Sequence, residues 1–218
     1  MYKKVNTKSK EELMRDLEKE NFRRKTLSFY KYVKIENPKE MRDFLFDKFE
    51  NLGCLGRIYV AHEGINAQMN VPEHNWEAFD KFIQNTKEFA GVPYKMAVEE
   101  KGKGIQSSFL KLIIKVRPKI VADGLDDSTF NPSDTGAYAT AEDVNNMIDR
   151  GVTVIDMRNM YEAAIGHFEN AKLMNVDTFR EQLAKVTDMF KDKKDEEVLL
   201  YCTGGIRCEK ASAWMKHN

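Results

Sequence analysis

Residues 198–207 read VLLYCTGGIR, and this stretch sets the fold class of the C-terminal part of the chain. Val198 to Cys202 is an apolar run of strand length, two glycines follow it, and a helical pattern runs from Arg207 to Asn218. A continuously apolar strand is typical of a parallel sheet that is covered on both faces. The stretch therefore predicts a strand, a tight turn and a helix within an α/β sheet.

The residues before this stretch show the same alternation of elements. Thr140 followed by Asp143 predicts a helix start, residues 152–157 form a second apolar strand, and residues 176–190 are mainly helical in pattern. Because strands that alternate with helices build parallel sheets, we predict an α/β domain over residues 137–218.

The N-terminal part has a different order of elements. Strands are predicted at residues 26–33, 57–61, 65–71, 94–98 and 109–116, with a loop around Gly102 and Gly104 before the last of them. Helices are predicted after Asn37-Pro38 and after Pro72. The order β-α-β-β-α-β, with one extra strand, predicts a ferredoxin-like (α+β, acylphosphatase-like) domain over residues 25–121.

Two further segments complete the predicted organisation. Ser9 with Glu12 three residues later has capping-box spacing, so residues 1–24 are expected to be a helical segment with a charged helix over residues 9–24. Residues 122–136 are rich in turn-forming Gly, Asp, Asn, Ser and Pro, which predicts a linker between the two domains.

Composition limits the classes of protein that the chain can belong to. It has 218 residues, of which 42% are hydrophobic, and three cysteines, an odd and sparse count that excludes a disulfide-stapled scaffold. No apolar run reaches the ~18 residues that a membrane span needs, and no signal peptide is visible. We therefore expect a cytoplasmic protein without a membrane partner.

The net charge of zero conceals two oppositely charged halves. Residues 1–121 carry 24 Lys and Arg against 17 Asp and Glu, whereas residues 122–218 carry 11 against 18. This asymmetry indicates two domains with different partners, or two halves whose opposite charges help them to dock.

The loop after the apolar strand predicts a reactive thiol at Cys202. Functional sites of open α/β sheets form at the carboxyl ends of strands, and glycines let consecutive backbone N–H groups turn inward. The N-terminus of the next helix and Arg207 add positive charge, which favours a thiolate. A lone cysteine at a strand end is usually a packing residue, but the glycines and the arginine favour a nucleophile. We predict Cys202 as the catalytic residue, with an active-site loop of Thr203, Gly204, Gly205, Ile206 and Arg207.

Three other residues are candidates for this site. Asp156 and Arg158 follow the neighbouring strand and either shape a pocket or form an ion pair that orders the loop. Cys208 either resolves an oxidised form of Cys202 or is a packing residue of the first helical turn. The His and Cys residues lack the spacing of metal ligands, so no metal site is predicted.

Basic residues cluster between positions 95 and 121. Lys115, Arg117 and Lys119 alternate, which would place them on one face of a strand and suits contacts with phosphates. The other basic residues of this segment are Lys95, Lys101, Lys103 and Lys111. We predict Lys111, Lys115, Arg117 and Lys119 as RNA-binding residues, with Tyr30, Tyr32 and Tyr59 as candidates for base stacking. A strand face that is merely solvated is the alternative.

The motifs resemble a known family. Residues 202–207, VIDMRNMYE at 154–162 and GHF at 166–168 resemble the active-site loop and the strand-and-loop signature of rhodaneses. The longer string YCTGGIRCEKA at 201–211, together with AHEGIN at 61–66, resembles one subfamily, the rhodanese-domain tRNA uridine(34) hydroxylases. The resemblance extends from about residue 25 to residue 218 and includes the order of the two domains.

The resemblance implies an oxidoreductase that acts on tRNA. Members convert uridine at the wobble position to 5-hydroxyuridine with dioxygen as co-substrate, and the residue matched by Cys202 is regarded as catalytic, with a persulfide as one option. No other cofactor is implied, and the electron donor and the oligomeric state are not indicated. A rhodanese-like domain normally continues with another strand, and the family usually carries a longer C-terminal extension, so we expect this chain to be truncated at its C-terminus.

Three alternatives remain at this stage. A rhodanese-type sulfurtransferase would use the same thiolate to carry sulfur, and an RNA- or protein-binding module would use the domain as a scaffold. Cysteine phosphatases have five residues between the cysteine and the arginine, whereas this loop has four, which makes a smaller cradle that fits phosphate poorly.

Overall fold

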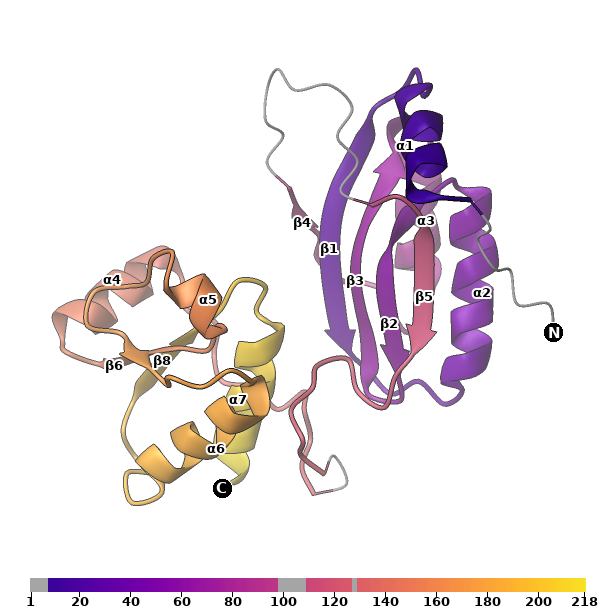
Figure 1. The fold of residues 1–218 in the computed structure, drawn as a ribbon. Helices are drawn as coiled ribbons and strands as arrows, with labels where there is room; N and C mark the ends of the chain where they lie inside the picture. Colours follow the sequence, from indigo (N-terminus) through magenta and orange to yellow (C-terminus); the bar gives the residue numbers. More distant parts are fainter. Residues whose placement is uncertain (1–7, 98–108, 127–128) are drawn as a thin grey trace. The chain divides into compact units, whose positions relative to one another are not determined.

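The computed structural model describes residues 8–97, 109–126 and 129–218 (Figure 1). The chain divides into two compact units, Met1–Ile120 and Val121–Asn218, each with its own hydrophobic core. The predicted loop around Gly102 and Gly104 lies outside the described residues, as do Lys101 and Lys103.

Unit 1 is built on a five-stranded sheet. Its elements in chain order are α1 (Lys10–Glu18), β1 (Arg24–Tyr32), α2 (Pro38–Asn51), β2 (Leu55–Ala61), β3 (Gly64–Pro72), the 3-10 turn η1 (Glu73–Asn75), α3 (Trp76–Asn85), β4 (Lys95–Met96) and β5 (Leu112–Val116). The strand order is β4-β1-β3-β2-β5, antiparallel except for β5, which pairs in parallel with β2. The predicted ferredoxin-like arrangement with one extra strand is confirmed.

Helices α2 and α3 cover one face of this sheet. Leu45 and Phe49 of α2 and Phe79 of α3 are fully buried against inward-pointing strand residues such as Phe29 and Ile58. The side chains on the other face are mostly polar or aromatic, because successive residues of a strand point to opposite faces.

Local capping signals placed the starts of α1 and α2 correctly, whereas the helix predicted directly after Pro72 begins only at Trp76, after the 3-10 turn η1. The side chain of Ser9 accepts a hydrogen bond from the N–H of Glu12, and the side chain of Asn37 does so from Glu40. The prediction of a helix reaching Arg24 is wrong, because α1 ends at Glu18 and β1 already begins at Arg24. Pairing of Arg24 with Pro72 of β3 prevails over the helical tendency of its charged neighbours.

Unit 2 contains a three-stranded parallel sheet of order β7-β6-β8. Its elements are α4 (Ala141–Asp149), β6 (Thr153–Asp156), α5 (Met160–Ala163), β7 (Lys172–Leu173), α6 (Phe179–Phe190), β8 (Val198–Tyr201) and α7 (Ile206–His217). Ile155 of the central strand, Leu183 and Val186 of α6 and Ala211 of α7 form its buried core. The predicted α/β class with a parallel sheet is confirmed.

The segment predicted as a linker, residues 122–136, packs against α7. The carboxylate of Asp123 and the ammonium group of Lys210 form a fully buried ion pair at 3.1 Å, and Lys210 lies over the ring of Phe130. The N–H of Gly136 donates to the hydroxyl of Ser212 at 3.0 Å. Within the part of the chain that the structure describes, no helix is long and apolar enough to cross a membrane.

Candidate active site

The Cys202 loop connects the end of β8 to the start of α7. Gly205 adopts φ = +89° as the N-cap of α7, a conformation that residues with a Cβ rarely adopt. This turn aims the N–H of Gly205 at the sulfur of Cys202, at an N···Sγ distance of 3.0 Å. The glycines were predicted to let backbone N–H groups turn toward Cys202, and the N–H of Gly205 does point at its sulfur.

The surroundings of Cys202 favour its thiolate. The thiol of Cys208 donates a hydrogen bond to it, and this is the largest cause that lowers the pKa of Cys202, to about 5. Burial opposes the shift, while the N–H groups of Cys208 and Gly205 and the positive charge of Arg207 support it. At neutral pH the half-buried Cys202 is therefore an ionised nucleophile.

The other two cysteines differ from Cys202. The pKa of Cys208 is raised, because its proton is held in the hydrogen bond to Cys202 and because it is buried. Cys54 lies in the core of unit 1, where burial raises its pKa to about 12. The structure thus brings Cys208 to the site and leaves Cys54 as a packing residue of the other unit.

Arg207 forms a two-armed ion pair with Glu162, a residue that the sequence analysis did not single out. The Nη1 and Nη2 atoms of Arg207 lie 2.8 and 3.0 Å from the two carboxylate oxygens of Glu162, which is on α5. The hydroxyl of Thr203 also donates to this carboxylate, at 2.5 Å. Arg207 lowers the pKa of Glu162 to about 2, so the carboxylate is ionised at neutral pH. The ion pair therefore links the Cys202 loop to α5.

Asp156 and Arg158 pair with each other at the end of β6. The guanidinium of Arg158 contacts both oxygens of the buried Asp156 carboxylate, at 2.7 to 3.1 Å, and donates to the carbonyl of Gly166 at 2.6 Å. The hydroxyl of Tyr201, the residue before Cys202, donates to Asp156 at 2.7 Å. Although burial opposes it, the hydrogen bonds from Arg158 and Tyr201 hold the pKa of Asp156 below its ordinary value. The pair orders the loop after β6 beside the strand that carries Cys202.

The predicted RNA-binding residues lie in unit 1, on or next to β5. Lys111 precedes the strand, Lys115 is on it, and the N–H of Arg117 extends the ladder by donating to the carbonyl of Val60 at 2.9 Å. These three side chains are exposed, whereas Lys119 is half-buried and follows the end of the strand. Their role in RNA binding stays a prediction.

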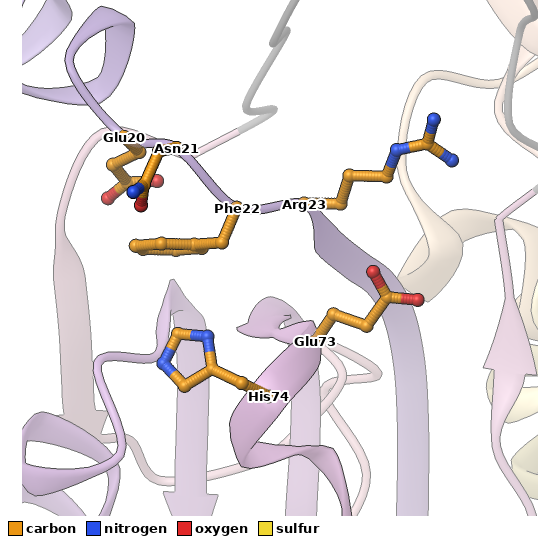
Figure 2. A pocket seen from close by; sticks show the side chains of 6 residues that line it. All are labelled: Glu20, Asn21, Phe22, Arg23, Glu73 and His74. Atoms are coloured by element: carbon orange, nitrogen blue, oxygen red, sulfur yellow. The ribbon is translucent and has the colours of Figure 1, made fainter.

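A surface hollow in unit 1 contains none of the predicted site residues. Phe22 and His74 face each other across it with ring centroids 4.8 Å apart (Figure 2). Its lining consists of Glu20, Asn21, Phe22, Arg23, Glu73 and His74. Among the described residues, no group of three His, Cys, Asp or Glu side chains is arranged to hold a metal ion.

With this geometry in place, comparison with protein families defines the class of the two units. Residues 24–120 match the UPF0176 acylphosphatase-like domain, and residues 140–218 match the rhodanese-like domain. The chain is therefore a rhodanese-domain protein with an acylphosphatase-like N-terminal domain.

Curated relatives share both domains in the same order. The chain is 50% identical over 214 residues to a protein of Leptospira interrogans, 53% identical over 195 residues to one of Enterobacter sp. (strain 638), and 51% identical over 212 residues to one of Cronobacter sakazakii. These alignments cover 98%, 88% and 96% of the chain, and each relative is named tRNA uridine(34) hydroxylase. The chain belongs to the two-domain family that these proteins represent. It spans 57%, 55% and 60% of their respective lengths, which is little more than half.

Proposed function

We propose that this protein hydroxylates uridine at the wobble position of tRNA, with dioxygen as the oxidant and Cys202 as the catalytic residue. The observation that carries the proposal is the Cys202 thiolate, held by the hydrogen-bond donors of its loop. It is supported by the 50% identity, over 98% of the chain, to a protein named tRNA uridine(34) hydroxylase. A reaction on tRNA also fits a cytoplasmic location.

A thiolate suits chemistry on a pyrimidine base. Uracil has an electrophilic carbon at position 6, and addition of a nucleophile there makes the neighbouring carbon 5 electron-rich, which is the atom that receives oxygen in 5-hydroxyuridine. The low pKa of Cys202 supplies the nucleophile at neutral pH without a separate general base. The overall balance consumes one dioxygen, two electrons and two protons per uridine and releases one water, with the electrons coming from an external donor. The sulfur leaves carbon 6 again when carbon 5 loses its proton.

Labelled dioxygen tests the proposal directly. The full-length protein is incubated with unmodified tRNA under ¹⁸O₂, and the nucleosides are analysed by mass spectrometry. We expect ¹⁸O in 5-hydroxyuridine with the wild type and none with Cys202→Ser, because a serine hydroxyl is not ionised at neutral pH. Full activity of Cys202→Ser would contradict a catalytic role of this loop.

A sulfurtransferase activity is the second candidate, because residues 140–218 match the rhodanese-like domain. A thiolate that attacks the outer sulfur of thiosulfate would take that sulfur as a persulfide and release sulfite. With ³⁵S-labelled thiosulfate, a sulfurtransferase should deliver label to an acceptor, and a hydroxylase should leave none in the product. Sulfur in the product without ¹⁸O in uridine would replace the first function by the second.

A further inference from the structure

The sheet face of unit 1 that α2 and α3 leave uncovered has an unusual composition. Its strands place Arg24, Arg57, Lys95 and Lys115 on this face. The other two strand cations point to the helix-covered face, where Lys25 lies over the ring of Trp76 and Lys31 donates to the carbonyl of Ala90. None of the five strands contains Asp or Glu.

The nearest acidic residues are on the helices, for example Glu40 and Asp47 of α2, or in the connections at the ends of the sheet, where Glu20 pairs with Arg24 and Glu63 accepts from the N–H of Ile120. The strands thus contribute cations and no carboxylate to this face in a chain whose net charge is zero.

Strand register arranges this face in two rows. Tyr30 of β1 and Tyr59 of β2 both pair with Asn66 of β3, and Tyr59 also pairs with Lys115 of β5. Because neighbouring strands are about 4.8 Å apart, the two tyrosines stand roughly 10 Å from each other on either side of Asn66. The adjacent row, also in register, consists of Lys95, Ser28, Gln68, Arg57 and Ile113.

Each tyrosine of the first row has a cation beside it. The ammonium group of Lys95 lies 5.5 Å from the ring centroid of Tyr30, and the guanidinium of Arg117 lies 5.4 Å from that of Tyr59. Gln68, in the centre of the face, is exposed and donates to the side chain of Asn66 at 2.6 Å. The face therefore combines rings for stacking on β1 and β2, amides for base edges on β3, and cations for phosphates on β4 and just after β5.

Both ends of the face are closed, which confines the exposed part to its middle. At one end Arg24 is held by Glu20, by the carbonyl of Gly53 and by the buried Asn70. At the other end the side chain of Asn66 donates to the carbonyl of Ile120 at 3.2 Å. The exposed middle contains Arg57, Gln68, Lys95, Lys115 and Arg117, with Tyr30 and Tyr59 half-buried among them.

We propose that this face, formed by Tyr30, Tyr59, Asn66, Gln68, Lys95 and Arg117, binds unpaired RNA by stacking its bases on the two tyrosines. Aromatic side chains on an open sheet are a general means of binding single strands, since every base has a face that can stack. Phosphates fit the basic side chains of the strands. The choice of RNA over DNA rests on the proposed function, whose substrate presents an unpaired anticodon loop.

Binding of a simple probe tests the proposal separately from catalysis. Fluorescence anisotropy of the full chain with labelled oligouridine is compared with an RNA duplex of equal length. We expect tighter binding to the single strand, about tenfold weaker binding with Tyr59→Leu, and near wild-type binding with Tyr59→Phe, which keeps the ring. Arg117→Gln should lower the slope of log affinity against log salt by about 0.7, the value of one phosphate contact.

Two matched controls come from the helix side of the same unit. Phe44→Leu removes an exposed ring of α2, and Lys81→Gln removes an exposed cation of α3, so neither should change RNA binding. Equal weakening by these controls, duplex binding as tight as single-strand binding, or unchanged binding by Tyr59→Leu would overturn the proposal. Unchanged RNA binding by Tyr59→Leu would indicate that the face binds a protein partner instead of RNA.

Failure of the inference and failure of the proposed function give different results. Cys202 is not a residue of the proposed face, so Cys202→Ser should lose ¹⁸O transfer while Tyr59→Leu still weakens oligouridine binding about tenfold in the Cys202→Ser background. Normal oligouridine binding without ¹⁸O in tRNA would reject the hydroxylase alone. Label in tRNA together with normal binding by Tyr59→Leu would reject this binding face alone.

Discussion

Removal of the Glu162 carboxylate should destabilise unit 2 in a pH-dependent way. Glu162 accepts two hydrogen bonds from Arg207, one from Thr203 and one from the N–H of Asn159. Its pKa falls from an ordinary 4.5 to about 2, mainly because of Arg207. At ~1.4 kcal/mol per pKa unit the full shift would correspond to about 3 kcal/mol, and screening by solvent at this partly exposed group lowers its contribution to the free energy of unfolding to about 1–2 kcal/mol. We therefore expect Glu162→Gln to lower the stability of unit 2 by about that amount at pH 7.

The sign of the pH dependence follows from the lowered pKa. The contribution of Glu162 is fully present above pH 4.5 and is lost as the pH falls toward 2. The difference between the wild type and Glu162→Gln should consequently shrink over this range, while the wild type itself becomes less stable. Arg207→Lys, which keeps the charge but loses the two-armed contact, should fall between them at pH 7.

Urea unfolding followed by tryptophan fluorescence measures this difference. The chain has two tryptophans, Trp76 in unit 1 and Trp214 in unit 2, so a Trp76→Phe background reports unit 2 alone. Glu169→Gln, an exposed carboxyl of the same unit, is the control and should leave the midpoint unchanged. Equal stability of Glu162→Gln and the wild type at pH 7, or a difference that does not depend on pH, would refute the ion pair as the contact that holds the loop.

Two further predictions concern the loop itself. The alkylation rate of Cys202, measured by mass spectrometry, should rise with pH around an inflection near 5. Cys208→Ala should move that inflection upward, because it removes the main hydrogen bond to the thiolate. An inflection near the ordinary value of 9 in the wild type would contradict the geometry of the loop. Gly205→Ala should destabilise unit 2 by ~1–2 kcal/mol in urea unfolding, because φ = +89° disfavours a residue with a Cβ. Gly204→Ala is the control and should be tolerated, because a Cβ on Gly204 meets no atom within 4 Å. Equal effects of the two substitutions would show that the φ of Gly205 is not essential.

Much of the fold could be predicted because its signals are local. The caps at Ser9, Asn37 and Thr140 each lie within three residues of the group they bind, so sequence spacing alone identifies them. Helix α5 and strand β7 were missed, since four and two residues carry no measurable periodicity. The early end of α1 was missed as well, because pairing of Arg24 with a residue 48 positions away decides it.

The loop that carries Cys202 was predictable, but the residues that surround it were not. Cys202 and Arg207 share a short loop, so their spacing is visible in the sequence. Glu162 lies 45 residues from Arg207, and only the folded sheet brings α5 beside the loop. The expectation that Arg207 and the loop N–H groups dominate the thiolate also needed revision, because the thiol of Cys208 contributes most. Cys208 lies in the first turn of α7, and the reversal of the chain at Gly205 brings this turn back to the sulfur.

The pairing of both arginines bears on which substrate the site accepts. Arg158 faces the carboxylate of Asp156, and Arg207 faces that of Glu162 while it also stabilises the thiolate of Cys202. A doubly negative donor such as thiosulfate is repelled by the ionised sulfur of Cys202, and the charge of Arg207, which opposes this repulsion, is already paired with Glu162. A neutral ring such as uracil meets no such repulsion. From these charges we infer that the loop disfavours thiosulfate relative to a neutral base, and Glu162→Gln, which frees Arg207, should shift the preference toward thiosulfate.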